Sequence, residues 1–145
     1  MPHNPIIDAR FIAPEIKQFI IKAPQIAQKR KAGQFVIVQV SERGERVPMT
    51  IVDSDSAAGT ITLIVQSVGK TTVEMNQLNA GDHLHYLVGP LGTPSRIEYF
   101  DNVIVIGGGV GTAVSFPQVK ALKAMGNHVT AIIGVRTKSM VILEE

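Results

Sequence analysis

The 145-residue chain contains no cysteine. This absence excludes disulfides, iron–sulfur clusters held by thiolates and cysteine nucleophiles within these residues. Charged residues are also few, at 18%, and the formal net charge is only +2, with neither a long basic run nor an acidic tail. We therefore expect no nucleic-acid partner.

Long apolar runs are missing as well. No stretch approaches the roughly 20 apolar residues that span a bilayer, and the N-terminus, "MPHNPIIDARF", has no basic region followed by a long apolar segment. The sequence therefore predicts a cytoplasmic protein without a membrane partner. What is present is an apolar content of 45% in a chain about one domain long, which is enough to bury a sizeable core.

The first part of the chain has the pattern of short β-strands separated by turn residues. These segments recur at a spacing of roughly 8–12 residues, which is typical of an antiparallel barrel or sandwich. The segment 69–82 interrupts them, because its apolar residues have mixed spacing, and we expect a short helix or turn there. The expected strands are 19–24, 33–41, 47–55, 59–69 and 83–89.

Near residue 100 the apolar period changes. The run at 102–108 is continuously apolar, as in a strand buried on both faces, and 128–135 has the same character. Between them lies a helical pattern that Gly126 ends. A β-rich domain over 1–98 would thus precede one βαβ unit over 99–145. The apolar positions expected to repeat along the helix are Val114, Val119, Leu122 and Met125.

A glycine cluster joins the first of these strands to the helix. Such a turn lets the backbone approach a phosphate, whose negative charge the helix N-terminus favours. The spacing is G-x-G-x-x-T, and the second strand ends without an acidic residue, with Arg136 and Lys138 following instead. From these residues alone, nucleotide binding is favoured and a purely structural turn stays open. The cluster consists of Gly107, Gly108, Gly109, Val110 and Gly111.

Five segments in a fixed order carry a resemblance to a known family. They are "AGQFVIVQ" at 32–39, "GERVPMTI" at 44–51, "VQSVGKTTVEM" at 65–75, "VGPLGTP" at 88–94 and "VIVIGGGVGTA" at 103–113. Together they cover almost the whole chain. They resemble the ferredoxin–NADP reductase superfamily. Within it the chain is similar to the electron-transfer subunit of dihydroorotate dehydrogenase and to the small subunit of NADH-dependent ferredoxin:NADP oxidoreductase, also called sulfide dehydrogenase.

This resemblance implies a flavin-binding antiparallel β-barrel of Greek-key type, followed by a partial α/β nucleotide-binding domain. It implies FAD as the cofactor, NAD(P)H as co-substrate and electron transfer as the function, with an iron–sulfur cluster only outside this chain. The implied partners are a larger catalytic or iron–sulfur subunit and a ferredoxin-like acceptor. Because the family's subunit is longer, we expect this chain to correspond to its N-terminal part. We further expect self-association through 102–145 and weak NAD(P)H binding.

By the same resemblance, the segment "RVPMT" lies along the flavin. Val47, Pro48 and Met49 would give an apolar wall beside the ring. Thr50 would hydrogen-bond near N5 and act as the catalytic residue. Arg46 would lie near the pyrophosphate or the ribityl chain, although an exposed loop arginine is the alternative from the residues alone.

The segment "IVQSVGKTT" resembles the family's second flavin contact. Its first three residues would meet the ring or ribityl chain through backbone groups, and the rest would close on the FAD pyrophosphate. Because these phosphate donors lie away from the ring contacts, we expect FAD rather than FMN. The "GKT" string lacks the upstream glycine of a P-loop. The residues concerned are Ile64, Val65, Gln66, Val68, Gly69, Lys70, Thr71 and Thr72.

Other chemistry has less support in the sequence. His83 and His85 alternate on an expected strand, but no third ligand is placed to join them, so we expect solvent-facing histidines and no metal site. No nucleophile elbow is present. Two alternatives to the electron-transfer module stay open: a non-catalytic FAD-binding or assembly module that docks on a larger subunit, and an inactive folded fragment that binds nothing and whose glycines serve only turns.

Overall fold

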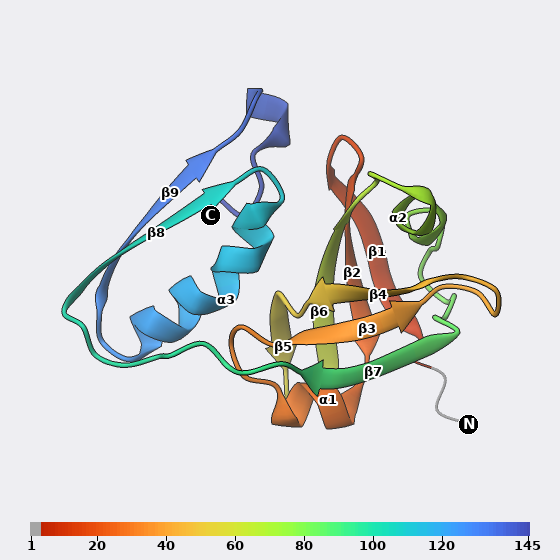
Figure 1. Ribbon diagram of the computed structural model, residues 1–145, viewed down its shortest axis with the longest axis horizontal. Coiled ribbons are helices and arrows are strands. Elements are labelled where there is room, and N and C mark those ends of the chain that lie inside the picture. The colour runs from red at the N-terminus through yellow and green to blue at the C-terminus, as the bar shows by residue number, and fades with distance from the viewer. Residues whose placement is uncertain (1–3) are drawn as a thin grey trace.

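The computed structural model describes residues 4–145, and two antiparallel sheets form its larger part (Figure 1). The expected antiparallel fold is confirmed, and the two sheets enclose one core in a barrel-like arrangement. The four-stranded sheet has the order β1 (Ile6–Ala13), β2 (Ile16–Lys22), β6 (Thr60–Gln66) and β5 (Asp53–Asp55). The three-stranded sheet has the order β4 (Arg46–Thr50), β3 (Phe35–Gln39) and β7 (Tyr86–Leu91).

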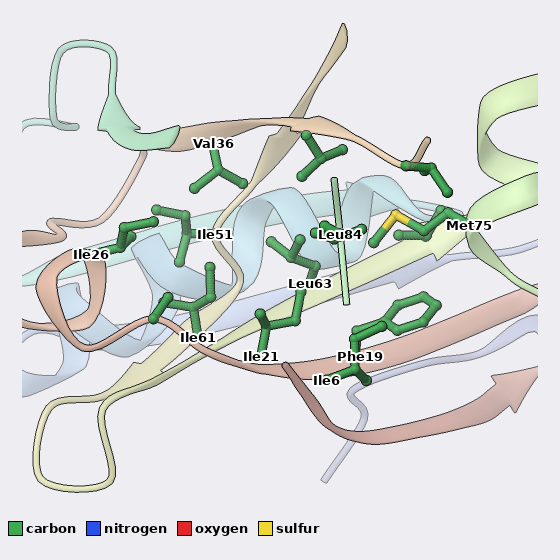
Figure 2. Packing of buried hydrophobic residues seen from close by; sticks show 14 of the residues in the cluster. Ile6, Phe19, Ile21, Ile26, Val36, Ile51, Ile61, Leu63, Met75 and Leu84 are labelled. Carbon is green, nitrogen blue, oxygen red and sulfur yellow. The ribbon is translucent and has the colours of Figure 1, made fainter. Parts of the chain in front are cut away.

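Alternate residues of the strands point into the shared core, as period-two patterning requires. In β2, Phe19 and Ile21 are fully buried, and Leu63 of β6 and Val36 of β3 meet them from the neighbouring strand and the other sheet (Figure 2). Burying one such side chain contributes about 1.5–3 kcal/mol. Met75, from α2 (Lys70–Met75), adds a fully buried side chain to the cluster. The short helix expected within 69–82 is thereby confirmed.

The expected single strand over 47–55 is wrong, because the chain changes sheets in its middle. Ile51 and Val52 are both buried, at 0% and 2% exposure. Consecutive side chains of an extended chain point to opposite sides, and here Ile51 packs in the barrel core while Val52 packs in a second apolar cluster. The Ile51 amide donates to Gln34 O at 3.2 Å and the Val52 amide to Thr62 O at 2.9 Å, which links the segment to both sheets.

One helix was not expected from the sequence. The helix α1 (Pro24–Lys29) begins where a strand over 19–24 was predicted, and β2 ends two residues before it, at Lys22. The local signal is weak, since the helix has only six residues and its N-cap, Ala23, makes no side-chain capping bond. Its first residue is proline, which helices accept at this position.

The C-terminal part is a βαβ unit, as predicted. The strands β8 (Asn102–Gly108) and β9 (His128–Gly134) pair in parallel, and α3 (Gly111–Ala124) lies on the side of this pair that faces the barrel (Figure 1). A 3₁₀ turn, η1 (Lys138–Met140), follows. None of the helices within residues 4–145 is long and apolar enough to cross a membrane.

The apolar residues of this unit are only partly buried, and the prediction that its strands are buried on both faces is wrong. Val114 and Met125 are about half exposed, at 51% and 50%. The strand pair is also not covered on both faces, since Ile104 and Ile106 are 67% and 72% exposed. Among residues 4–145, α3 is the helix that packs on the β8–β9 pair, and it covers only one of the two faces of that pair. The residues of α3 that are buried are Thr112, Ala113, Pro117 and Leu122.

A second apolar cluster ties the βαβ unit to the barrel. Ala113 of α3 and Ile142 of the C-terminal segment pack there with Ala13, Ile16 and Val52 of the barrel. An ion pair between Lys120 Nζ and Asp53 Oδ1, at 2.9 Å, spans the same seam. Exposed pairs contribute little, so the apolar contacts hold the two parts together.

Arg30 lies next to the segment that contains Val52 and Asp53, and its pKa is shifted. Burial lowers the pKa of its guanidinium, while the Asp53 carboxylate acts in the opposite direction. Its Nη2 donates to Val52 O at 3.4 Å. The arginine thus braces the segment where the chain changes sheets.

Replacing Gly107 with alanine should destabilise the protein. The added Cβ would lie 2.8 Å from Thr112 Cα and 2.9 Å from Ser115 Oγ, so α3 would have to move away from β8. We expect a loss of roughly 1–3 kcal/mol in the free energy of unfolding, measured by urea denaturation. Gly108→Ala is the matched control, because its Cβ would meet no atom within 4 Å. Equal stability of the two variants would contradict this packing role.

Candidate functional site

A pocket of about 290 Å³ lies between the barrel and the N-terminal end of α3. Its walls are mainly apolar with a few polar groups, which is typical of sites for cofactors and other small molecules. Four separate segments contribute to it. Its lining residues are Val47, Pro48, Met49, Thr50, Val52, Ile64, Val65, Gln66, Val68, Thr72, Val110, Ala113 and Val114.

Two unpaired strand edges frame this pocket. β4 is the outer strand of its sheet, with β3 on one side and, among residues 4–145, no strand on the other. β6 pairs with β2 along its whole length, but β5 covers it only from Thr60 to Thr62. The backbone of Ile64–Gln66 therefore has one unpaired edge. Unpaired edges present rows of N–H and C=O groups, which suit the polar rim of a flat heteroaromatic ring.

The side chains of β4 alternate between the two faces of the strand. Val47 and Met49 pack partly against the barrel core, and Pro48 and Thr50 alternate with them. A proline is accepted here because β4 is an edge strand. All four residues line the pocket.

Arg46, by contrast, is not among the lining residues. Its guanidinium lies 4.6 Å from the centre of the Tyr86 ring, and its Nε donates to Gln39 Oε1 at 3.5 Å. The structure therefore holds Arg46 on the β3–β7 side of its strand and gives it partners within the barrel.

The segment after β6 turns sharply into α2. Thr72 Oγ1 accepts hydrogen bonds from the amides of Val68 and Gly69, at 2.9 and 3.0 Å, and donates to Gly69 O. Val68 lines the pocket but is 77% exposed, as a residue at its rim would be. Lys70 is exposed and Thr71 is buried, and neither lines the pocket.

The backbone at Gly69 is open to a bound group. Its φ of −157° is extended and accessible to any residue, and a Cβ built there would meet no atom within 4 Å. Backbone strain thus plays no part at this glycine. The backbone is therefore accessible at the start of α2, where the first amides of a helix have no intrahelical partner.

The glycines of the loop differ in why a glycine is present: close packing, a positive φ, or open space beside the backbone. Gly107 is required for close packing of α3, as described above, and Gly109 has a φ of +55° and donates its amide to Gly134 O at 2.8 Å. Gly108 and Gly111 have open space where a side chain would stand. Val110 joins the loop to the pocket wall.

A shallow groove with a cavity volume of about 440 Å³ runs along the same loop, lined by residues of β8 and α3 that include Gly108, Gly111 and Val114. Arg136 is exposed two residues beyond the end of β9.

Sequence reasoning missed three pocket residues: Val52, Ala113 and Val114. Ala113 and Val114 directly follow the glycine loop in the first turn of α3, and their nearness to that loop was the available signal. His83 and His85 are both exposed. Among residues 4–145, no group of three or more His, Asp or Glu side chains could hold a metal ion.

The sequence matches the family model of the oxidoreductase FAD-binding domain over residues 3–95. It is 41% identical over 140 residues to the dihydroorotate dehydrogenase B (NAD(+)) electron transfer subunit homolog of Thermotoga maritima, covering 97% of this chain and 50% of that protein. It is 34% identical over 145 residues to the corresponding electron transfer subunit of Streptococcus mutans, covering 97% and 55%. The chain thus spans about half the length of the curated relatives it matches.

Solved structures agree with these matches. A structure of an NADH-dependent reduced ferredoxin-NADP oxidoreductase, studied for flavin-based electron bifurcation, superposes with a TM-score of 0.95 at 39% identity, covering 99% of this chain and 52% of that one. Phthalate dioxygenase reductase, at 19% identity, has a TM-score of 0.75 over 96% of this chain and shares the fold. The resemblance noted in the sequence is confirmed, and the chain belongs to the family of oxidoreductase FAD-binding domains.

Proposed function

We propose that this chain is the FAD-binding electron-transfer module of an NAD(P)H-dependent oxidoreductase of the ferredoxin–NADP reductase type. One observation carries the proposal: a single pocket is lined both by the barrel strands β4 and β6 and by the start of α3, directly after the glycine loop. The pocket thus joins a wall for a flavin ring to a loop suited to a nucleotide phosphate. The module is proposed to consist of a flavin domain over 1–98 and a nucleotide unit over 99–145; residues 1–3 lie outside the described part.

The barrel residues would hold the flavin. Pro48 and Met49 would lie against the ring, and the Thr50 hydroxyl would donate a hydrogen bond near N5. The unpaired backbone edge of Ile64–Gln66 would meet the polar rim of the ring or the ribityl chain. Bound FAD would supply the redox chemistry, accepting a hydride from a nicotinamide nucleotide and passing electrons on singly.

The remaining proposed contacts surround the phosphates. The pyrophosphate of FAD would lie over Gly69 and the first amides of α2, near Val68 and Thr72, with Lys70 and Thr71 as nearby donors. The nicotinamide nucleotide would lie over the glycine loop, with Arg136 as a cation for its phosphates. Arg46 has partners within the barrel, so its proposed contact with the pyrophosphate or ribityl chain requires it to leave Tyr86. The residues of the loop are Gly107, Gly108, Gly109, Val110 and Gly111.

The partners are proposed from the relatives. Those proteins are named electron transfer subunits, and a structural neighbour is a ferredoxin-NADP oxidoreductase. We propose a larger catalytic or iron–sulfur subunit as the partner of this chain, and a ferredoxin-like protein as the acceptor. The chain has no cysteine, so an iron–sulfur centre bound by thiolates has to come from outside these residues.

The cofactor itself is the first test. The purified protein should be yellow, and flavin released by acid should be FAD by chromatography, because the open backbone at Gly69 lies beyond the ring-binding strands. Under anaerobic conditions NADH or NADPH should bleach the visible flavin band. FMN in place of FAD would contradict the cofactor assignment, whereas bound FAD that neither nucleotide bleaches would favour a non-catalytic binding module.

Replacing Gly69 with threonine tests the phosphate contact. Threonine is β-branched and is accepted at a helix N-cap about as well as glycine, so the apoprotein should keep its free energy of unfolding within about 0.5 kcal/mol. The added side chain would occupy the space proposed for the phosphates. We expect the dissociation constant for FAD, measured by fluorescence titration of the apoprotein, to rise by roughly tenfold or more. An unchanged constant would show that the ligand does not approach Gly69.

A further inference from the structure

A buried polar side chain contacts the segment 64–69, which we propose as part of the flavin site. Asn76 directly follows α2, is only 6% exposed and is not among the residues that line the pocket. Buried asparagines are kept where their hydrogen bonds are needed, because an amide without partners is costly away from water. The position of its partners therefore indicates what Asn76 does.

The amide group of Asn76 donates toward the segment that joins β6 to α2. Its Nδ2 lies 2.8 Å from Ser67 Oγ and 3.1 Å from Val65 O, with a longer contact of 3.3 Å to Glu15 O. The Ser67 amide donates to the same Glu15 carbonyl at 2.9 Å. These contacts hold Val65 and Ser67 through a side chain that does not itself line the pocket.

A buried lysine holds Asn76 in turn. Lys17, on β2, is only 4% exposed, and its Nζ donates to Asn76 O at 3.1 Å and to Leu78 O at 2.6 Å. A cation at the last carbonyls of a helix satisfies groups that lack intrahelical partners. The end of α2 is thereby fixed to the four-stranded sheet.

The side-chain hydrogen bonds of Asn76 are made by its amide nitrogen, Nδ2. Among residues 4–145, its buried Oδ1 has no hydrogen-bond partner. The donated hydrogen bonds therefore fix the side chain toward Val65 O and Ser67 Oγ.

We propose that Asn76 is a positioning residue for the flavin site. Through its contacts with Val65 and Ser67 it fixes the path of the backbone over residues 65–69. Gln66 and Val68 thereby keep the positions in which they line the pocket. This inference rests on the proposed function, since it takes the pocket to be the flavin site. Through this backbone Asn76 controls both the affinity for FAD and the hydrogen bonds that set the reduction potential of the bound flavin.

The test compares Asn76→Ala with Asn127→Ala. Asn127 is an equally buried asparagine, also 6% exposed, whose Nδ2 donates to Glu98 O at 2.8 Å and to Leu122 O at 2.9 Å. None of its partners lines the pocket, so its loss should cost similar stability without reaching the flavin. The measurements on each protein are the thermal midpoint, the dissociation constant for FAD and the midpoint potential of the bound flavin.

We expect Asn76→Ala to raise the dissociation constant for FAD by roughly tenfold, as the loss of one to two hydrogen bonds implies, and to shift the midpoint potential. Asn127→Ala should lower the thermal midpoint comparably, while the dissociation constant for FAD stays within about twofold of the parent and the midpoint potential does not shift. If Asn76→Ala does not fold, Ser67→Ala serves in its place, because it removes only the 2.8 Å contact, and a smaller rise of about threefold is expected.

Two results would overturn the inference, and they differ from each other. If the unmodified protein binds FAD and the variants at Asn76 and Asn127 change affinity and potential equally, or neither changes them, the role of Asn76 is structural only. If the unmodified protein binds no flavin at all, the proposed function fails, and the inference fails with it.

Discussion

The pocket depends on one constraint, the burial of two consecutive side chains in two different apolar clusters at the point where the chain changes sheets. Ile51 packs in the barrel core and Val52 in the cluster shared with the βαβ unit, and at this point β4 has ended and β5 joins the other sheet. β4 therefore remains an edge strand, and β5 is too short to cover the end of β6. The site is thus a by-product of how the barrel buries its apolar residues.

The second requirement is that the glycine loop meets these edges. The apolar cluster around Val52, Ala113 and Ile142 brings the start of α3 against the barrel, and Val52 and Ala113 also line the pocket. One contact surface therefore both joins the two parts of the chain and completes the cavity. Gly107 contributes from the other side of α3, since only a residue without a side chain lets the helix approach β8 this closely.

The sequence predicts those features that are encoded locally. Alternating apolar residues indicate the strands, and the glycine loop indicates the turn before α3. The helix α1 is too short for such a signal, and the buried face of α3 depends on two neighbours at once, so helical spacing selected Val114 instead of Ala113. The contact of Arg46 with Tyr86 and the network of Asn76 depend on residues far apart in sequence, 61 positions between Asn76 and Glu15. No local pattern contains this information.

The open space at Gly69 and Gly108 has a consequence for how this protein can change over evolutionary time. Side chains introduced there meet no atom of the protein within 4 Å, so selection for folding does not remove them. If the proposed ligand contacts are correct, selection for ligand binding does remove them. Lineages that no longer need the ligand can therefore fill these positions and still inherit an intact barrel. A search for descendants with a lost function should examine these two glycines before the core.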